Sequence, residues 1–266
     1  MPSVLITGAS KGLGRATAEE FAARGHRVVA TARDPRTLDD LDVDQRLALD
    51  VTDQASVDAA IAEAGDLDIL VSNAGVIFHA SVEATPPAEL ERLFSANTVG
   101  SIRTAQAVLP QMRTRGSGRL LFLSSVVGRV VLPGNAAYAA TKWALEALVE
   151  ELAIEVGHFG IHASLIEPGA ISTGALDDVL RYALPDDPYA PLMSQRGDVF
   201  SSMLTPAEVA TAIVDAAEMD SPPLRVPVGA STVQTLTARD GAPFDGAVPG
   251  HPPRLVRSRL CEPAPN

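Results

Sequence analysis

Apolar residues along the chain gather in short runs that alternate with longer amphipathic segments. The runs at 3–7, 27–32, 46–50, 68–73, 119–125, 161–168 and 224–229 are predicted strands, and most are almost continuously apolar, which is typical of parallel strands buried on both faces. The segments at 13–24, 53–64, 87–114, 137–157 and 206–219 are predicted helices. This alternation predicts an α/β fold with a doubly wound parallel sheet, right-handed crossovers and helices on both faces, in a single domain over 1–237.

The stretch TGASKGLG, from Thr7 to Gly14, separates the first predicted strand from the first predicted helix. Glycines at 8, 12 and 14 permit a tight turn and a close approach of the backbone to a ligand, and the start of the helix offers unpaired N–H groups to a phosphate. In a doubly wound sheet, ligands bind beyond the carboxyl ends of the strands. The stretch therefore predicts a cradle for the pyrophosphate of a dinucleotide.

A second stretch, YAATK, places Tyr138 and Lys142 four residues apart near the start of a predicted helix. Because an α-helix turns once in about 3.6 residues, such a pair lies on one face. The phenol and the ammonium are predicted to point into the same space.

Composition narrows the class of protein. The 266 residues carry 21 Lys and Arg against 33 Asp and Glu, and the net charge of −12 opposes binding to nucleic acid or to anionic membranes. The single cysteine, Cys261, forms no internal disulfide, which fits a reducing compartment. With no leader-like start and no apolar run approaching about 18 residues, a cytoplasmic protein without a membrane segment is expected.

The glycine spacing G-x-x-x-G-x-G and the motifs that follow it resemble the short-chain dehydrogenase/reductase superfamily. These motifs occur in order: Asp50 after the third strand, Asn73-Ala74-Gly75 after the fourth, Asn97 in the long helix, Ser125 at the end of the fifth strand, then Tyr138, Lys142, Pro168-Gly169 and Thr173. The resemblance covers roughly residues 1–230. It implies a Rossmann-like fold and an NAD(P)-dependent oxidoreductase of the ketoreductase type, EC 1.1.1.-.

The resemblance also implies catalytic roles for Asn97, Ser125, Tyr138 and Lys142. In the family, the tyrosine is the general acid/base, the lysine holds the nicotinamide ribose, and the serine thirteen residues before the tyrosine hydrogen-bonds the substrate oxygen. Asn97 resembles the asparagine that kinks its helix and holds a water linking the lysine to solvent. Since a nearby Lys⁺ favours a phenolate, the pKa of Tyr138 is expected to fall below its usual value of about 10.

The coenzyme is expected to be NADP(H) in preference to NAD(H). Lys11 in the glycine loop and Arg33 after the second strand resemble the cations of NADP-preferring members, which suit the 2′-phosphate. Asp34 stands where an NAD-binding acid might be sought, but it precedes Pro35 and is better explained as the N-cap of a short helix. The residues expected to contact the coenzyme are Gly8, Ser10, Lys11, Gly12, Leu13, Gly14, Arg33, Asp50, Val51, Asn73, Ala74, Gly75, Tyr138, Lys142, Pro168, Gly169, Ile171 and Thr173. Asp50 and Val51 are matched to the adenine pocket, and Ile171 and Thr173 to the carboxamide.

The segment 174–204 is predicted to be a substrate-binding lid with an apolar underside, which favours an apolar carbonyl or alcohol substrate. Its apolar and aromatic residues are Leu176, Leu180, Tyr182, Leu184, Tyr189, Leu192, Met193, Phe200 and Met203. The opposite wall is expected from Val126, Val127, Leu132 and Asn135. The Pro- and Gly-rich stretch 238–266 shows neither helical nor strand period and is expected to be an irregular extension.

The sequence indicates reduction of a ketone to a secondary alcohol by NADPH. Two alternatives stay open: an NAD-dependent secondary-alcohol dehydrogenase, and a nucleotide-sensing regulator without turnover, against which the retained Ser125, Tyr138 and Lys142 argue. No metal is expected, because Gly157 and Gly160 break any helix around His158 and His162 and no carboxylate motif completes a site. By analogy with the family, whose members pair through the helices corresponding to 87–114 and 137–157, a homodimer or homotetramer is expected.

Overall fold

A parallel sheet forms the centre of the protein, whose computed structural model describes residues 1–173, 179–194 and 203–242. The strands are β1 (Ser3–Ile6), β2 (Arg27–Ala32), β3 (Gln45–Ala48), β4 (Ile69–Ser72), β6 (Gly118–Leu123), β7 (Ile161–Pro168) and β9 (Arg225–Val228). They lie side by side in the order β3-β2-β1-β4-β6-β7-β9. The predicted Rossmann-like, doubly wound α/β fold is confirmed. Because the strand order reverses between β1 and β4, the ligand crevice of such a sheet lies at their carboxyl ends.

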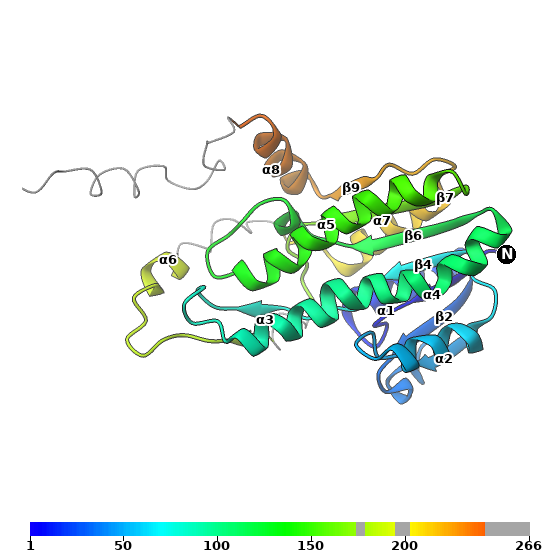
Figure 1. Cartoon of the computed structure of the whole chain (residues 1–266), viewed down its shortest axis with the longest axis horizontal. Coiled ribbons are helices and arrows are strands. Elements are labelled where there is room, and N and C mark those ends of the chain that lie inside the picture. The colour runs from blue at the N-terminus through cyan, green and yellow to red at the C-terminus, as the bar shows by residue number, and fades with distance from the viewer. Residues whose placement is uncertain (174–178, 195–202, 243–266) are drawn as a thin grey trace, which may run out of the picture.

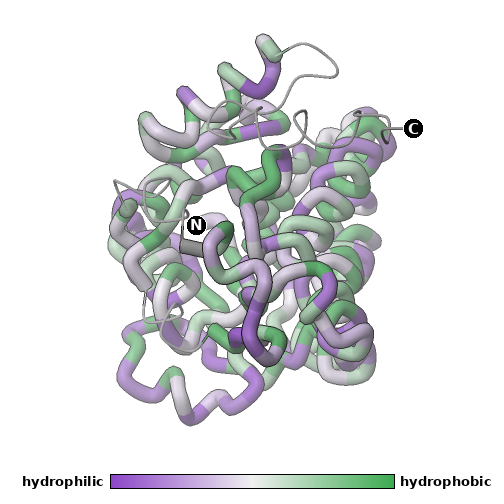
Figure 2. Tube along the Cα trace, turned by 90° about the vertical axis from the view of Figure 1, so that its left-hand side faces the viewer, coloured by the Kyte–Doolittle hydropathy of each residue, from purple (hydrophilic) through white to green (hydrophobic). Residues whose placement is uncertain are grey.

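Helices cover both faces of this sheet (Figure 1). Helices α1 (Gly12–Ala23) and α7 (Pro206–Glu218) pack against each other on one face, while α2 (Gln54–Ala64), α4 (Gly100–Arg115) and α5 (Ala136–Gly157) cover the other. Figure 2 shows hydrophilic and hydrophobic residues interspersed along the helices, as one-sided burial requires. Within the described ranges, none of the helices is both long and apolar enough to cross a membrane.

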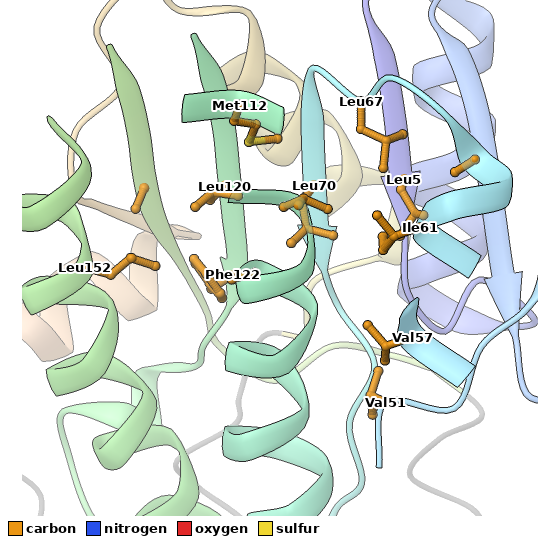
Figure 3. Close-up of a cluster of buried hydrophobic side chains, with 14 of the residues drawn as sticks. Leu5, Val51, Val57, Ile61, Leu67, Leu70, Met112, Leu120, Phe122 and Leu152 are labelled. Carbon is orange, nitrogen blue, oxygen red and sulfur yellow. The ribbon is translucent and has the colours of Figure 1, made fainter. Parts of the chain in front are cut away.

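Alternate residues of each strand pack into the hydrophobic core on opposite faces of the sheet. Leu5 and Leu70 pack with Phe122 on the side of α2, α4 and α5 (Figure 3). Ile6 and Leu121, their neighbours along the strands, are buried on the side of α1 and α7. Successive side chains of a strand point to opposite faces, so the continuous apolar runs in the sequence reflect burial on both sides.

The predicted long helix at 87–114 is helical along its whole length but not uniform. It consists of α3 (Pro87–Phe94), a π-helical turn η2 (Ser95–Val99) and α4, which ends at Gly116 with a φ of 73°. Single π turns inside α-helices are rare and often lie at functional sites. Here the turn contains Asn97.

The short helix predicted after Asp34 is the 3₁₀ turn η1 (Pro35–Leu38). The elements that were not predicted are the 3₁₀ turn η3 (Val126–Gly128), a pair of short strands β5 (Phe78–His79) and β8 (Leu180–Arg181), and helices α6 (Ala190–Ser194) and α8 (Ala230–Asp240). Helix α8 ends at Asp240, past the predicted boundary at 237. Only Thr232 and Leu236 of α8 are buried, so its apolar stripe is too short to be evident in the sequence. The remainder of the predicted extension, with Cys261, lies outside the described residues.

Candidate active site

The glycine loop lies between β1 and α1 and has the backbone shape that the sequence predicted. Gly8 and Gly12 adopt φ values of +70° and +58°, which side chains rarely tolerate. A Cβ on Gly14 would lie 2.2 Å from the carbonyl oxygen of Gly8, so only glycine fits there. Helix α1 begins with Lys11 as N-cap, and this residue makes no side-chain hydrogen bond to the helix start. The first N–H groups of α1 are therefore available for an anion such as pyrophosphate.

Asn73 and Thr7 hold this loop against the end of β4. The backbone N–H groups of Asn73 and Ala74 both donate to Thr7 Oγ1 at 2.9 Å. Asn73 Nδ2 donates to the carbonyl oxygens of Thr7 at 2.8 Å and Gly8 at 3.2 Å. Sequence reasoning gave Thr7 no role. It could have been found from its position, because a hydroxyl directly before the glycine turn, at the switch point of the sheet, is placed to join the two strand ends.

Ser125 and Tyr138 meet at the carboxyl end of β6. Ser125 follows the strand and is the N-cap of η3; its Oγ accepts from the backbone N–H of Val127 at 3.3 Å and donates to the carbonyl oxygen of Pro168 at 3.5 Å. Tyr138 lies in the first turn of α5, and the Ser125 side chain is close enough to its hydroxyl to favour the phenolate. The structure therefore brings together two groups that the sequence separates by thirteen residues.

Lys142 lies one turn further along α5 and is only 3% exposed. Its Nζ is 5.7 Å from the centroid of the Tyr138 ring, in agreement with the shared face expected from the spacing, and donates to the carbonyl oxygen of Leu123 at 2.6 Å. Burial lowers the pKa of Lys142 to about 8, although the nearby Glu146 carboxylate opposes this effect.

The expected lowering of the Tyr138 pKa was wrong. Burial raises the pKa of Tyr138 to about 12, and the nearby Ser125 side chain only partly offsets this. The reason is the position of the ammonium: it points to the Leu123 carbonyl oxygen and does not contact the phenol closely. At neutral pH the phenol therefore keeps its proton.

Asn97 connects three parts of the site from within the π turn. It is fully buried, its Oδ1 accepts from Val76 N at 2.7 Å, and its Nδ2 donates to Val76 O at 2.9 Å and to Thr141 Oγ1 at 3.1 Å. Thr141 Oγ1 in turn donates to the carbonyl oxygen of Tyr138 at 2.7 Å. The chain after β4 is thus tied to the first turn of α5, and the spacing of Tyr138 from the sheet depends on this link.

After β2, the carboxylate of Asp34 is paired with Arg36, whereas Arg33 is exposed. Asp34 is the N-cap of η1, accepts from Arg36 N at 3.1 Å and forms an ion pair with the Arg36 side chain at 2.7 Å, so the predicted capping role is confirmed. Arg33 is exposed at the carboxyl end of the strand. Its charge contributes to lowering the pKa of Asp50, although hydrogen bonds from Thr52 contribute more. Arg33 and Asp50 therefore lie near each other.

Other residues expected to contact the coenzyme flank the loop. A Cβ on Gly12 would lie 3.5 Å from the side chain of Thr173, so the segment after β7 crosses the glycine turn. Ile171 is bridged to Leu204. The side chain of Val51 is buried against Gly100 of α4 and does not face the surface.

The predicted lid is described in part. Tyr182 contacts Phe78 with 5.3 Å between ring centroids, and β8 pairs with β5, which holds this part of the segment beside α5. Leu180 of β8 is 48% exposed, and the lid role stays a prediction. Leu176 and Phe200 lie outside the described residues. On the other side, the expected wall residues Val126, Val127 and Leu132 cluster with Tyr138, and the Oδ1 atom of buried Asn135 has no hydrogen-bond partner among the described residues.

The chain is similar to known proteins in both sequence and fold. The family described as short chain dehydrogenase matches residues 2–181. The chain belongs to the short-chain dehydrogenase/reductase family. Oxidoreductase BOA17 of Botryotinia fuckeliana is 34% identical over 245 residues, covering 86% of this chain and 89% of that protein. The 3-ketodihydrosphingosine reductase of Bacteroides thetaiotaomicron is 32% identical over 246 residues, covering 89% and 90%. This short-chain dehydrogenase/reductase is accordingly an NAD(P)-dependent oxidoreductase.

Solved structures of other short-chain dehydrogenases share the fold. One from Streptomyces avermitilis has a TM-score of 0.81 and 39% identity, covering 89% of this chain and 90% of that one. Another, from Burkholderia cenocepacia J2315 in complex with NADP, has a TM-score of 0.77 at 23% identity, covering 90% and 93%. At that identity the second likeness extends to the fold alone.

Proposed function

We propose that this short-chain dehydrogenase/reductase is an NADP(H)-dependent reductase that converts a ketone of an apolar substrate to a secondary alcohol. The observation that carries the proposal is the convergence of Ser125 and Tyr138 at the carboxyl end of β6, with Lys142 Nζ 5.7 Å from the centroid of the Tyr138 ring. These groups lie at the same edge of the sheet as the glycine loop. This edge would hold a coenzyme and a substrate next to each other.

The glycine loop fits the coenzyme that this function needs. The positive φ values of Gly8 and Gly12 and the close contact between Gly14 and the Gly8 carbonyl group keep the turn tight against the start of α1, where a pyrophosphate would lie. Lys142 would hold the nicotinamide ribose, as the family resemblance implies. Bound NADPH would supply the hydride.

Tyr138 and Ser125 would act on the substrate oxygen. As the carbonyl carbon is reduced, the electron pair of the C=O π bond moves to oxygen, and the phenolic O–H of Tyr138 gives its proton to that oxygen. The Oγ–H group of Ser125 hydrogen-bonds the same oxygen and stabilises the charge that develops on it. Asn97, through Thr141, holds Tyr138 at the correct distance from the sheet.

The protonation state of Tyr138 supports reduction as the direction. With a pKa of about 12, the phenol is protonated at neutral pH and is ready to act as an acid. An oxidation would require the phenolate at the start. The alternative of an NAD-dependent alcohol dehydrogenase would therefore need a lower pKa in the working complex.

The charges after β2 support NADP(H). Arg33 is exposed, whereas the carboxylate of Asp34 is occupied by Arg36 and by its capping role. A phosphate at the ribose 2′ position would meet cations here, and a 2′-hydroxyl would find no free carboxylate at Asp34.

A ketone is supported by the name of the relative that is a 3-ketodihydrosphingosine reductase, and an apolar one by the hydrophobic cluster that Val126, Val127 and Leu132 form beside Tyr138.

An association into homodimers is also part of the proposal. Trp143 and Leu148 of α5 are 41% and 46% exposed, and Val99 beside α4 is 47% exposed. Exposed apolar side chains on adjacent helices suit pairing with a second copy, which light scattering of the purified protein would detect as twice the monomer mass.

The first test is a fluorescence titration with NADPH and NADH, followed by turnover of a panel of apolar ketones. The proposal expects NADPH to bind at least tenfold more tightly, about 1.4 kcal/mol. Tyr138→Phe should abolish turnover and leave the NADPH affinity nearly unchanged, and this retained affinity is the control for folding. Equal affinities would reverse the coenzyme assignment, and binding without turnover of any ketone would favour the nucleotide-sensing alternative.

A further inference from the structure

Glu146 lies on the same side of α5 as Tyr138 and Lys142, further along the helix. It follows Lys142 by one helical turn and is only 5% exposed. Its Oε1 accepts a hydrogen bond from Ser124, the residue before Ser125, and its Oε2 accepts from Arg225 Nε of β9 at 3.0 Å. The buried Glu146 carboxylate thus contacts Ser124, the residue before Ser125, and lies one helical turn from Lys142.

A second carboxyl group, that of Glu167, is buried beside the first. Glu167 is the penultimate residue of β7, is fully buried, and directly precedes Pro168, whose carbonyl oxygen accepts from Ser125. In the part of the chain that the structure describes, neither oxygen of Glu167 accepts a hydrogen bond. Arg225 Nε is 3.7 Å away and is shared with Glu146.

The charges around this pair do not balance if both carboxyl groups are ionised. Arg225 is the cation in contact, and it also binds Glu150 at 2.5 Å, while Arg129 acts from a greater distance and pairs with Asp240. On α5 itself the facing groups are Lys142 and Glu150. A buried carboxylate without a donor is costly, whereas a protonated carboxyl group next to a carboxylate supplies the missing O–H donor. Burial and the Glu146 charge accordingly raise the pKa of Glu167 to about 7.

We propose that Glu146 and Glu167 form a buried pair sharing one proton, and that this pair positions the reacting groups of the site. The pair acts on Ser125 through two residues: Ser124, whose Oγ donates to Glu146, and Pro168, which follows Glu167 and accepts from Ser125. The negative charge on Glu146 keeps Lys142 protonated. Both glutamates are positioning residues, since neither touches substrate or coenzyme. The inference rests on the proposed function in so far as Ser125 and Lys142 are the groups that act.

The effect on Lys142 has a definite sign. Burial lowers the pKa of Lys142 to about 8, and Glu146 is the charge that raises it. Replacing Glu146 by a neutral residue removes that contribution, so the ammonium is lost at a lower pH. Since the ammonium is expected to hold the ribose and to lie beside Tyr138, NADPH affinity and turnover both fall as it loses its proton.

The decisive comparison uses Glu146→Gln with Glu150→Gln as the matched control. Glu150 lies one turn further on α5 and binds the same arginine, but its side chain is 53% exposed. The NADPH dissociation constant and kcat/KM with a ketone are measured from pH 5 to 10. In Glu146→Gln the alkaline decline of both quantities moves about one pH unit towards acid, and in Glu150→Gln it stays at the wild-type position. Equal profiles for the two variants would overturn the charge effect on Lys142.

The shared proton is tested without any turnover, by ¹³C NMR of protein labelled at the glutamate δ-carbons. The signal that disappears in Glu167→Gln should titrate near pH 7 in the wild-type protein and at a lower pH in Glu146→Gln. A midpoint near the usual 4.5 would refute the pair. Since this measurement needs no substrate, a protein that reduces no ketone would refute the proposed function, and the titration would still show whether the two glutamates share a proton.

Ser124→Ala keeps the inference testable if Glu146→Gln does not fold. This variant removes the hydrogen bond to Glu146 without changing any charge. It should lower kcat at least several-fold and leave both KM and the alkaline decline unchanged. A wild-type kcat would show that Ser124 does not transmit the position of the pair to Ser125.

Discussion

Replacement of Gly14 by alanine tests the glycine cradle at its tightest point. The new Cβ would lie 2.2 Å from the carbonyl oxygen of Gly8 and 2.5 Å from Asn73 Nδ2. Neither atom is free to move: the first belongs to the backbone of the turn, and the second donates to the carbonyl oxygens of Thr7 and Gly8. The loop must therefore shift, and the Asn73 hydrogen bonds must weaken or break.

The cost follows from these contacts. Overpacking of a rigid site costs about 1–3 kcal/mol, and each weakened hydrogen bond about 1 kcal/mol more. The better helix propensity of alanine returns up to about 1 kcal/mol, because Gly14 lies within α1. A net loss of about 2 kcal/mol in the free energy of unfolding is expected, which for a chain of this size lowers Tm by roughly 4–8 °C. Since the displaced atoms form the cradle, NADPH affinity should fall by at least tenfold.

Gly157→Ala is the matched control. Gly157 is also helical, but no atom lies within 4 Å of the position that its Cβ would occupy. This change should raise the stability by about 0.5–1 kcal/mol and leave the NADPH affinity unchanged. Urea unfolding and fluorescence titration of both variants provide the measurement. If Gly14→Ala matches the wild-type protein in stability and affinity, the steric account of the loop is refuted.

Three further changes test separate parts of the molecule. Arg33→Asp should lower the ratio of NADPH to NADH affinity by at least tenfold, about 1.4 kcal/mol; an unchanged ratio would assign the phosphate contact to another cation. Lys142→Ala should weaken NADPH binding and lower kcat together, because the buried ammonium that donates to Leu123 is lost, and an effect on only one of the two would separate its roles. Thr205→Ala removes the capping box that Thr205 and Glu208 form at the start of α7, so thermal unfolding should show a loss of about 1 kcal/mol with kcat/KM unchanged; a stability equal to wild type would mean that water replaces the cap.

The strands, the glycine turn and the cap at Asp34 depend on interactions between residues close in sequence, and they were predicted for that reason. An apolar run is compatible with a strand buried on both faces whatever lies beside it. Gly8 and Gly12 are required by their own backbone angles. Asp34 caps η1 through Arg36, two residues away.

Helix α8 and the π turn at Asn97 could not be predicted in this way. The stripe of α8 consists of two buried residues, so the helix depends on the surface that β9 and η3 offer to it. The π turn depends on the bonds that Asn97 makes to Val76 and Thr141, which are distant in the sequence. Such contacts exist only when the sheet has brought the segments together.

The charged groups of the site also show which properties follow from the sequence and which depend on the tertiary structure. The four-residue spacing correctly placed Tyr138 and Lys142 on one face, because helix geometry is local. Their pKa values were not predictable, since they depend on burial and on the direction in which the ammonium points, here the carbonyl oxygen of Leu123 on a neighbouring strand. Glu146 and Glu167 are separated by twenty-one positions along the chain, and only the packing of α5 against β7 and β9 buries their carboxyl groups together. Electrostatic free energies depend on distance and solvent exposure in three dimensions, and these quantities do not exist until the chain has folded.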